Sequence, residues 1–268
     1  MNKYCSRMIV ALCAALLLAP FLAPYDESQQ HRSAAMQPPS LAHSGATADK
    51  PIFLFGTDEY GRDLFSRFLY GGRRALLAGL LAAAAAVLIG FVAGAFSGFH
   101  GGWPDAVLMR CSELFLSLPW MYLLLAIRAL LPLRIGQSGS LLMVVSVAAL
   151  AGWPRPSRII RGIFLSARDR PYISVARSLG AKNLYIIGRH IFPEVRDILW
   201  TQMATLLPQF MLVGVTLSFL GLGEDEQHAS WGGMLGALRH FSVMESHSGY
   251  LLTAAAITLV LFLLTICG

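Results

Sequence analysis

The sequence predicts an all-α polytopic membrane protein with about six transmembrane helices, and three observations lead to this prediction. Hydrophobic side chains make up 56% of the 268 residues and charged side chains only 13%, whereas soluble domains usually carry about 25% charged residues. The apolar residues gather in uncharged blocks, and a bilayer core requires roughly 20 apolar residues in a helix. One polar segment between two blocks is strongly basic, as cytoplasmic loops between spans are. This composition excludes a disordered chain, a collagen-like fibre and a secreted disulfide scaffold.

Six apolar blocks are the predicted spans. They cover residues 8–25, 75–99, 107–131, 136–154, 198–223 and 246–268. The first block follows Lys3 and Arg7, so a cleaved signal peptide is an alternative for it. A retained span is favoured, because no clean small-x-small cleavage site is visible. The predicted divisions are a first helix at 1–25, an extracytoplasmic segment at 26–74 and a membrane core at 75–268.

The extracytoplasmic segment contains a predicted amphipathic helix. Thr57 is a suitable helix N-cap, and Asp58 and Glu59 would then lie in the first turn, where negative charge is favourable. Apolar side chains further along share one face and charged ones fall largely on the other, which predicts a helix along the membrane surface. A helix that only packs on the protein is the alternative.

The second span carries a stripe of small residues at every fourth position, which includes Gly90, Gly94 and Gly98. Lipid provides no hydrophobic drive for helices to associate, so close backbone approach through such stripes supplies the contact energy. We therefore expect these three glycines to pack against another helix.

Basic residues determine the predicted orientation. Nine of the 21 Lys and Arg residues lie between Arg155 and Arg196, which places the loop 155–197 on the cytoplasmic side. With six spans the N-terminus lies on the same side of the cytoplasmic membrane, although four arginines at positions 62–74 oppose this orientation. Nucleic-acid binding is not expected, because its motifs and interleaved aromatic residues are missing.

The sequence contains no motif of a catalytic, cofactor or metal site. The patterns HExxH, GxSxG and G-x-x-x-x-G-K-[ST] are absent, so the chain has no usual means of binding ATP phosphates. The four cysteines have neither zinc-ligand nor disulfide-framework spacing. We expect no enzymatic activity, no cofactor and no metal, and any pumping has to be powered from outside the chain.

The basic loop contains a segment, 168–193, that predicts two short helices joined by a glycine. Pro171 suits a helix start, Gly180 can adopt the left-handed conformation that ends a helix, and Asn183 can cap a second helix that ends before Pro193. The first helix has an apolar face with no lipid to meet, formed by Tyr172, Val175, Ala176 and Leu179. A partner protein is the expected contact for this face.

This segment resembles the EAA loop of permease subunits from binding-protein-dependent ABC transporters, which is the coupling helix that docks on the ATPase. The matching residues are Gly180 after the alanine-containing helix and the motif Arg189-His190-Ile191-Phe192-Pro193. Ser174 stands at the family's glutamate position and Val175 at the following alanine. The family's salt bridge to the ATPase is therefore not available, and docking would rest on shape, apolar contact and arginines such as Arg177.

Three further stretches resemble the dipeptide, oligopeptide and nickel branch of this family, in its C-type permease subunit. They are Gly56-Thr57-Asp58-Glu59-Tyr60-Gly61-Arg62-Asp63, then Ser218-Phe219-Leu220-Gly221-Leu222-Gly223, and then Ser230-Trp231-Gly232. The first stretch is the outer-segment motif, for which either a cap and ion-pair arrangement or direct contact with substrate or binding protein remains open.

The resemblance implies a permease that moves di- or oligopeptides by ATP-driven alternating access. Its implied partners are a second permease subunit, two ABC ATPase subunits, an extracytoplasmic solute-binding protein and the lipid bilayer. The implied ATPase-coupling residues are Tyr172, Ser174, Ala176, Arg177, Leu179, Gly180, Ala181, Arg189, His190 and Pro193. Transport of nickel or another small solute, and a scaffold that recruits a soluble partner without transport, are the alternatives.

Overall fold

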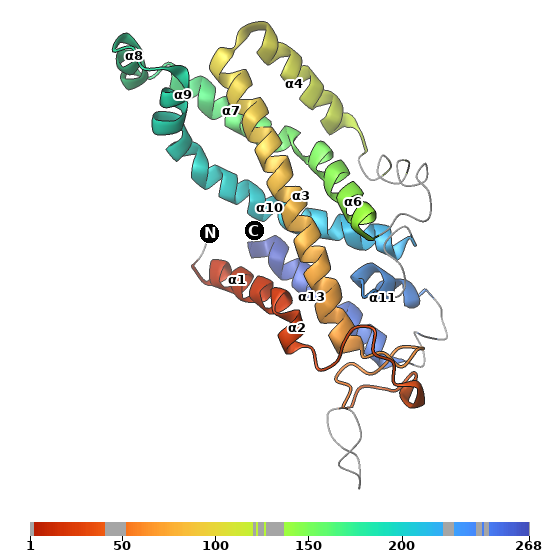
Figure 1. Ribbon diagram of the computed structural model, residues 1–268. Coiled ribbons are helices and arrows are strands. Elements are labelled where there is room, and N and C mark those ends of the chain that lie inside the picture. Colours follow the sequence, from red (N-terminus) through yellow and green to blue (C-terminus); the bar gives the residue numbers. More distant parts are fainter. Residues whose placement is uncertain are drawn as a thin grey trace. The chain divides into compact units, whose positions relative to one another are not determined.

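The computed structural model describes residues 3–40, 52–119, 122, 126, 137–221, 228–239, 243 and 247–267. Within these ranges the regular elements are helices, and extended pairing is limited to one bridge between Thr57 and Asp63 (Figure 1). The helices are α1 (Lys3–Leu17), α2 (Ala19–Leu22), η1 (Arg32–Ala34), α3 (Leu64–His100), α4 (Gly102–Ser117), α6 (Gln137–Gly152), α7 (Pro154–Arg168), α8 (Pro171–Ser178), α9 (Asn183–Ile186), η2 (Ile187–Ile191), α10 (Phe192–Phe219), α11 (Trp231–Ala237) and α13 (Ser248–Cys267). The predicted all-α class is confirmed.

In the described part of the chain, three helices are long and apolar enough to cross a membrane. They are Leu64–His100, Asn183–Phe219 and Ser248–Ile266, and they contain most of the predicted second, fifth and sixth spans. α1 and α6 overlap the predicted first and fourth spans but have only 15 and 16 residues. α4 begins the predicted third span, and most of the remainder of that span lies outside the described residues.

The prediction of a separate surface helix that begins at Thr57 is wrong. α3 begins at Leu64 and continues to His100 without a break, so its first turns belong to the same helix as the second span. Asp63 supplies the cap, because its carboxylate accepts a hydrogen bond from the Ser66 backbone N–H at 2.8 Å. The Thr57 hydroxyl instead donates to the Ala34 carbonyl.

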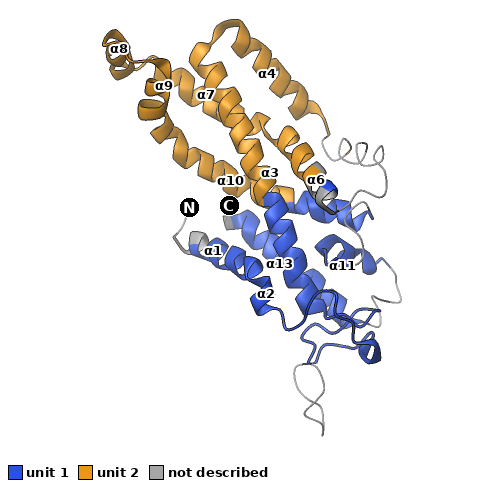
Figure 2. Ribbon diagram, in the orientation of Figure 1, with its two compact units in different colours: residues 1–79, 135–140, 211–268 blue, residues 80–134, 141–210 orange. Residues whose placement is uncertain are grey.

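The chain forms two compact units, which Figure 2 shows in different colours. Unit 1 comprises residues 1–79, 135–140 and 211–268, and unit 2 comprises residues 80–134 and 141–210. The coupling segment predicted from the sequence lies within unit 2, and the outer-segment motif lies within unit 1.

In unit 2, α3 packs closely on α7 through the predicted glycine stripe. A Cβ atom added at Gly98 would lie 2.6 Å from the Arg161 carbonyl oxygen, and one at Gly90 would lie 2.9 Å from the Trp153 carbonyl oxygen. A Cβ at Gly94 would collide with the Ser157 carbonyl oxygen. The three glycines therefore let the two backbones meet, and the predicted packing stripe is confirmed.

Replacing Gly94 with valine is expected to force α3 and α7 apart, because the added atoms meet backbone that cannot turn away. Overpacking of this kind costs about 1–3 kcal/mol, so the melting temperature of the purified protein should fall. The matched control is Gly162→Val on α7, where an added Cβ has no neighbour within 4 Å. Equal losses of stability in the two variants would contradict the close approach.

Candidate functional site

The candidate site is the coupling segment, residues 168–193 of unit 2, and its first helix begins where the sequence predicts. Pro171 is the first residue of α8, and Arg170 before it is extended, with ψ of 144°. Proline favours this arrangement, since it disfavours helical geometry in the preceding residue and lacks the N–H that a first helical position leaves unbonded. In Figure 1, α8 follows α7 at the end opposite α6.

Gly180 ends α8 in the predicted left-handed conformation, with φ of +85°. Its N–H donates to the Arg177 carbonyl at 3.0 Å, and the Ala181 N–H donates to the Ala176 carbonyl at 3.1 Å. These two bonds form a Schellman motif, which satisfies carbonyl groups that the helix end would otherwise leave unbonded. An added Cβ at Gly180 has no neighbour within 4 Å, so the need for glycine is conformational and not steric.

α8 is fixed to unit 2 by Ile173, which is fully buried. The hydrophobic cluster around it draws residues from α3, α7, α9, η2 and α10. Its buried members are Ala95, Phe99, Ile160, Phe164, Ala167, Ile173, Ile186, Ile191 and Val195. The burial of Ile173 was not predicted, because on a short helix periodicity alone does not separate a buried side from an exposed one.

The opposite side of α8 and the start of α9 expose apolar side chains. Leu179 and Leu184 each retain 83% of their accessible surface, and Val175, Tyr185 and Tyr172 are also exposed. The Ser174 hydroxyl at the glutamate position donates to the Pro171 carbonyl at 2.7 Å. The segment therefore presents exposed apolar surface and carries no acid at the glutamate position, and its use in docking stays a prediction.

The second half of the segment differs from the prediction. Asn183 is the first residue of α9 and makes no cap with its side chain, because Lys182 holds the N-cap position in an extended conformation. Residues 187–191 form a π-helical turn, and α10 continues directly through Pro193. The predicted helix end before Pro193 is thus wrong. Pro193 lies in the first turn of α10, and the π-helical turn before it, with its wider i→i+5 spacing, lets the chain continue.

His190 of the Arg-His motif lies between two tyrosines of the segment. Its ring centroid is 6.0 Å from that of Tyr172 and 5.8 Å from that of Tyr185, so it links α8 to α9. Arg189 is exposed. Arg177 lies over the Phe99 ring of α3 at 5.8 Å, which adds a cation–π contact between α8 and the body of the unit.

A polar cluster at the base of α8 was not predicted from the sequence. Arg170 forms an ion pair with Glu194 of α10, and the Tyr172 hydroxyl donates to the same carboxylate at 3.2 Å. The hydrogen bond between Arg170 and Tyr172, together with the charge of Glu194, raises the pKa of Arg170 above its ordinary value. Glu194 thus places an acid between α8 and α10, whereas Ser174 leaves none on the exposed face.

A second polar cluster joins α7 to α3 and α4. Arg161 donates to both carboxylate oxygens of Asp105 in α4, with the Nη2–Oδ2 distance at 2.6 Å, and Ser97 of α3 donates to the same carboxylate. The hydrogen bond from Arg161 lowers the pKa of Asp105 below its ordinary value. Paired donors of this kind fix geometry as well as charge.

The outer-segment motif forms a compact turn in unit 1. Gly56 and Gly61 have positive φ of 79° and 75°. Asp58 accepts hydrogen bonds from the Arg62 backbone N–H at 2.8 Å and from Arg62 Nε at 2.6 Å. Asp58, Arg62 and Asp63 are buried, whereas Glu59 is exposed. These contacts correspond to the cap and ion-pair alternative, and they leave contact with substrate or binding protein untested.

In unit 1, residues in the first turns of α3 contact the residues just before α11 and at its start. Arg67 donates to the carbonyl groups of Glu27, at 3.1 Å, and His228, at 3.2 Å. Trp231 is buried, stacks on Phe68 and donates from Nε1 to the Phe68 carbonyl at 2.8 Å. The first turns of α3 are thus in direct contact with Trp231, although Phe68 and Trp231 lie far apart in the sequence.

The family model for the binding-protein-dependent transport system inner membrane component matches residues 75–268, which contain the glycine stripe and the entire coupling segment. The chain belongs to this family. The resemblance noted in the sequence is therefore confirmed, and the protein is a multi-pass inner-membrane component of a transport system that depends on a binding protein.

Individual relatives of this family member are also similar over most of its length. The probable D,D-dipeptide transport system permease protein DdpC of Escherichia coli strain K12 is 34% identical over 87% of this chain and 73% of its own. The dipeptide transport system permease protein DppC of Bacillus subtilis strain 168 is 31% identical over 85% of this chain and 66% of its own. A solved structure of the MetNI methionine ABC transporter in an inward-facing conformation has a TM-score of 0.46 and 18% identity, over 70% of this chain and 90% of that one.

Glu194→Gln is expected to loosen α8 from α10, since the amide keeps the shape of the side chain but loses the charge. An exposed ion pair contributes little to stability because solvent screens it, so hydrogen exchange of the α8 amides should accelerate by no more than about fivefold. Asp197→Asn is the control, because its pair with Arg196 joins neighbouring residues of one helix. The swapped pair Arg170→Glu with Glu194→Arg should restore slow exchange, and failure to do so would count against the ion pair.

Acid is expected to weaken the contact between α4 and α7. The folded pKa of Asp105 is depressed, so its stabilising effect is present above the ordinary aspartate pKa and is lost as pH falls through the folded value. The melting temperature measured from pH 7 down to pH 3 should therefore fall less steeply in Asp105→Asn than in the parent, from a lower starting point. Parallel curves for the two proteins would contradict this assignment.

Proposed function

We propose that this chain is the permease subunit of an ABC importer that moves di- or oligopeptides across the cytoplasmic membrane by alternating access. Membership of the binding-protein-dependent family supports the transport role. The relatives described as D,D-dipeptide and dipeptide permeases support the substrate class. The observation that carries the proposal is the coupling segment itself, in which exposed apolar side chains lie on a helix that the fully buried Ile173 attaches to unit 2.

The proposed assembly contains this chain, a second permease subunit, two ABC ATPase subunits and an extracytoplasmic binding protein. The chain supplies no P-loop, so the partner subunits hydrolyse ATP. The coupling segment and the N-terminus are on the cytoplasmic side, and residues 26–74 are on the outer side. This orientation follows the excess of basic residues between positions 155 and 196.

Docking on the ATPase would use the exposed side chains of α8 and α9. Leu179 and Leu184 provide most of the apolar surface, and Arg177 and Arg189 provide positive charge at its edge. Since Ser174 replaces the family's glutamate, the apolar contacts carry more of the docking in this chain than an ion pair does. Glu194 of α10 supplies an acid for attachment within the chain, through its pair with Arg170 at the start of α8.

Coupling would follow from the rigidity of the segment. Ile173, the Schellman turn at Gly180 and the Arg170–Glu194 pair hold α8 to α7 and α10, so a displacement of α8 by the ATPase would move these helices with it. ATP can shift the equilibrium between the outward and inward states only if its binding free energy differs between these two states. This difference is of the order of a few kcal/mol.

The test is reconstitution of the complete transporter in vesicles with its ATPases and binding protein, followed by uptake of a labelled dipeptide. ATP-dependent peptide uptake is expected. Uptake of nickel ions in place of peptide would contradict the proposed substrate class and favour the nickel alternative. ATPase binding without uptake of any solute would indicate a scaffold and contradict the transport proposal.

Gly180→Val is expected to reduce uptake at least tenfold while membrane insertion stays normal, because a β-branched residue does not tolerate φ of +85°. Gly188→Val is the matched control, since this glycine lies in the same segment and an added Cβ has no neighbour within 4 Å. Uptake at the parental rate by the Gly180 variant, at equal expression, would show that the segment does not couple ATP hydrolysis to transport.

A further inference from the structure

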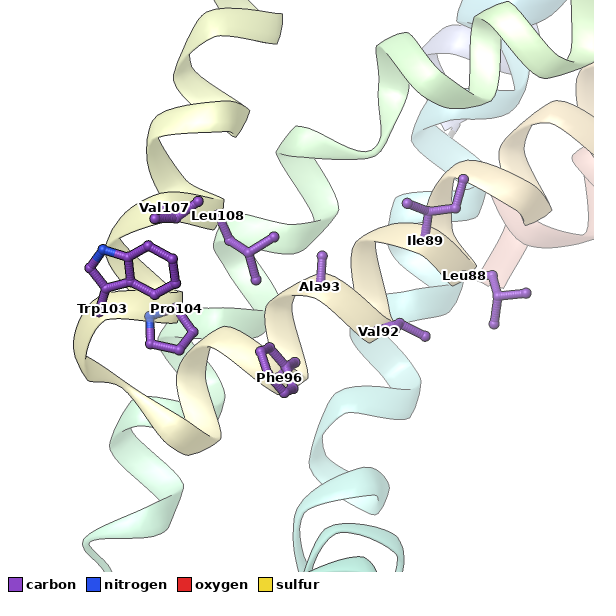
Figure 3. Close-up of a pocket in the computed structure, with 9 residues that line it drawn as sticks. All are labelled: Leu88, Ile89, Val92, Ala93, Phe96, Trp103, Pro104, Val107 and Leu108. Carbon is purple, nitrogen blue, oxygen red and sulfur yellow. The ribbon is translucent and has the colours of Figure 1, made fainter.

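An apolar groove of about 680 Å³ lies between α3 and α4 in unit 2. Figure 3 shows side chains from α3 along one side of it, including Leu88, Val92 and Phe96, and side chains from α4, including Trp103 and Val107, along the other. All five are exposed, and Trp103 retains 78% of its accessible surface. The stripe of glycines faces α7, so the groove lies on another face of the same helix.

The groove matches one leaflet of a membrane in length. Leu88 and Phe96 are eight residues apart on α3, which corresponds to about 12 Å along a helix. Half of a hydrocarbon core is about 15 Å thick. Leu88, Val92 and Phe96 belong to the predicted second span, residues 75–99, and α3 is apolar enough to cross a membrane. This assignment would place the open side of the groove at the depth of the lipid chains.

Positive charge gathers at the end of the groove that holds Trp103. Arg168 Nη1 lies 2.8 Å from the position of a Cβ added at Gly101, in the turn between α3 and α4. Arg168 pairs with Asp169 at 3.4 Å, and the Asp169 side chain is 76% exposed, so solvent screens this pair. Arg168 also interacts electrostatically with Asp105, which is already paired with Arg161. Arg161 is balanced by Asp105, whereas Arg177, over Phe99, adds a further cation beside this turn.

We propose that this groove binds an acyl chain of an anionic phospholipid, whose phosphate lies beside Arg168 at the α3–α4 turn. The charge of the turn selects the occupant, because basic clusters at the ends of spans bind anionic headgroups. A tryptophan at the same level is typical of the boundary between headgroups and hydrocarbon. The proposal goes beyond peptide transport and holds for either orientation of the chain.

The bound lipid would act on the coupling segment. Arg168 is the last residue of α7, and α8 begins three residues later. A phosphate at this position would neutralise the charge that Arg168 brings next to the turn and hold the end of α7 at the membrane surface. The position from which α8 projects would then depend on the anionic lipid content of the membrane.

The experiment measures quenching of Trp103 by brominated lipid in vesicles that contain the complete transporter. The signal of Trp103 is the difference between the parent protein and Trp103→Phe. Brominated phosphatidylglycerol should quench it more strongly than brominated phosphatidylcholine at equal mole fraction. Arg168→Gln should reduce this preference about fivefold, as expected for one basic residue near a membrane surface.

Arg110→Gln is the control for a general change in charge, because Arg110 is an exposed residue of α4 paired with Glu113 at 3.0 Å. It should leave the lipid preference unchanged. In a second measurement, a benzoylphenylalanine introduced at Val92 should photocrosslink to phospholipid. Crosslinking to the second permease subunit, to another copy or to another part of this chain would overturn the proposal, as would equal quenching by the two lipids.

Discussion

The close approach of α3 and α7 is the constraint on which the rest of unit 2 depends. Gly90, Gly94 and Gly98 bring the α3 backbone against the carbonyl groups of α7, and a larger residue at any of them would force the two helices to shift. This contact positions Phe99 and Phe164 in one cluster, and the same cluster receives Ile173 from α8. An exposed helix of only eight residues is therefore supported by packing between two much longer ones.

Two kinds of interaction connect the exposed face to this support. Burial of Ile173 attaches α8 to the unit. Polar contacts around Arg170 and Arg161 determine the orientation of the helices, since hydrogen bonds and ion pairs fix geometry more than they add stability. The replacement of the family's glutamate by Ser174 fits this division. The exposed face of α8 is mainly apolar, and the acid that directly follows the segment, Glu194, is used within the chain.

Local signals in the sequence predicted the features that depend on one or two residues. Pro171 at a helix start, Gly180 in a left-handed turn and the glycine stripe follow from the backbone properties of those residues, and all three predictions are confirmed. Features that depend on distant partners were missed. Glu194 lies 24 residues from Arg170, and Ile173 is buried because side chains from five other elements surround it. Thr57 and Asp63 are both good caps, and the turn between them decides in favour of Asp63.

The π-helical turn at residues 187–191 sets the angular phase of the exposed face. α9, this turn and α10 form one continuous helix from Asn183 to Phe219. Each added residue in the turn would therefore rotate α9 about the helix axis by about 100° relative to α10. The turn accommodates one surplus residue without a break in the helix. A single insertion or deletion between Ile187 and Ile191 would thus swing Leu184 around the helix axis and away from Leu179, without any change in the composition of either surface.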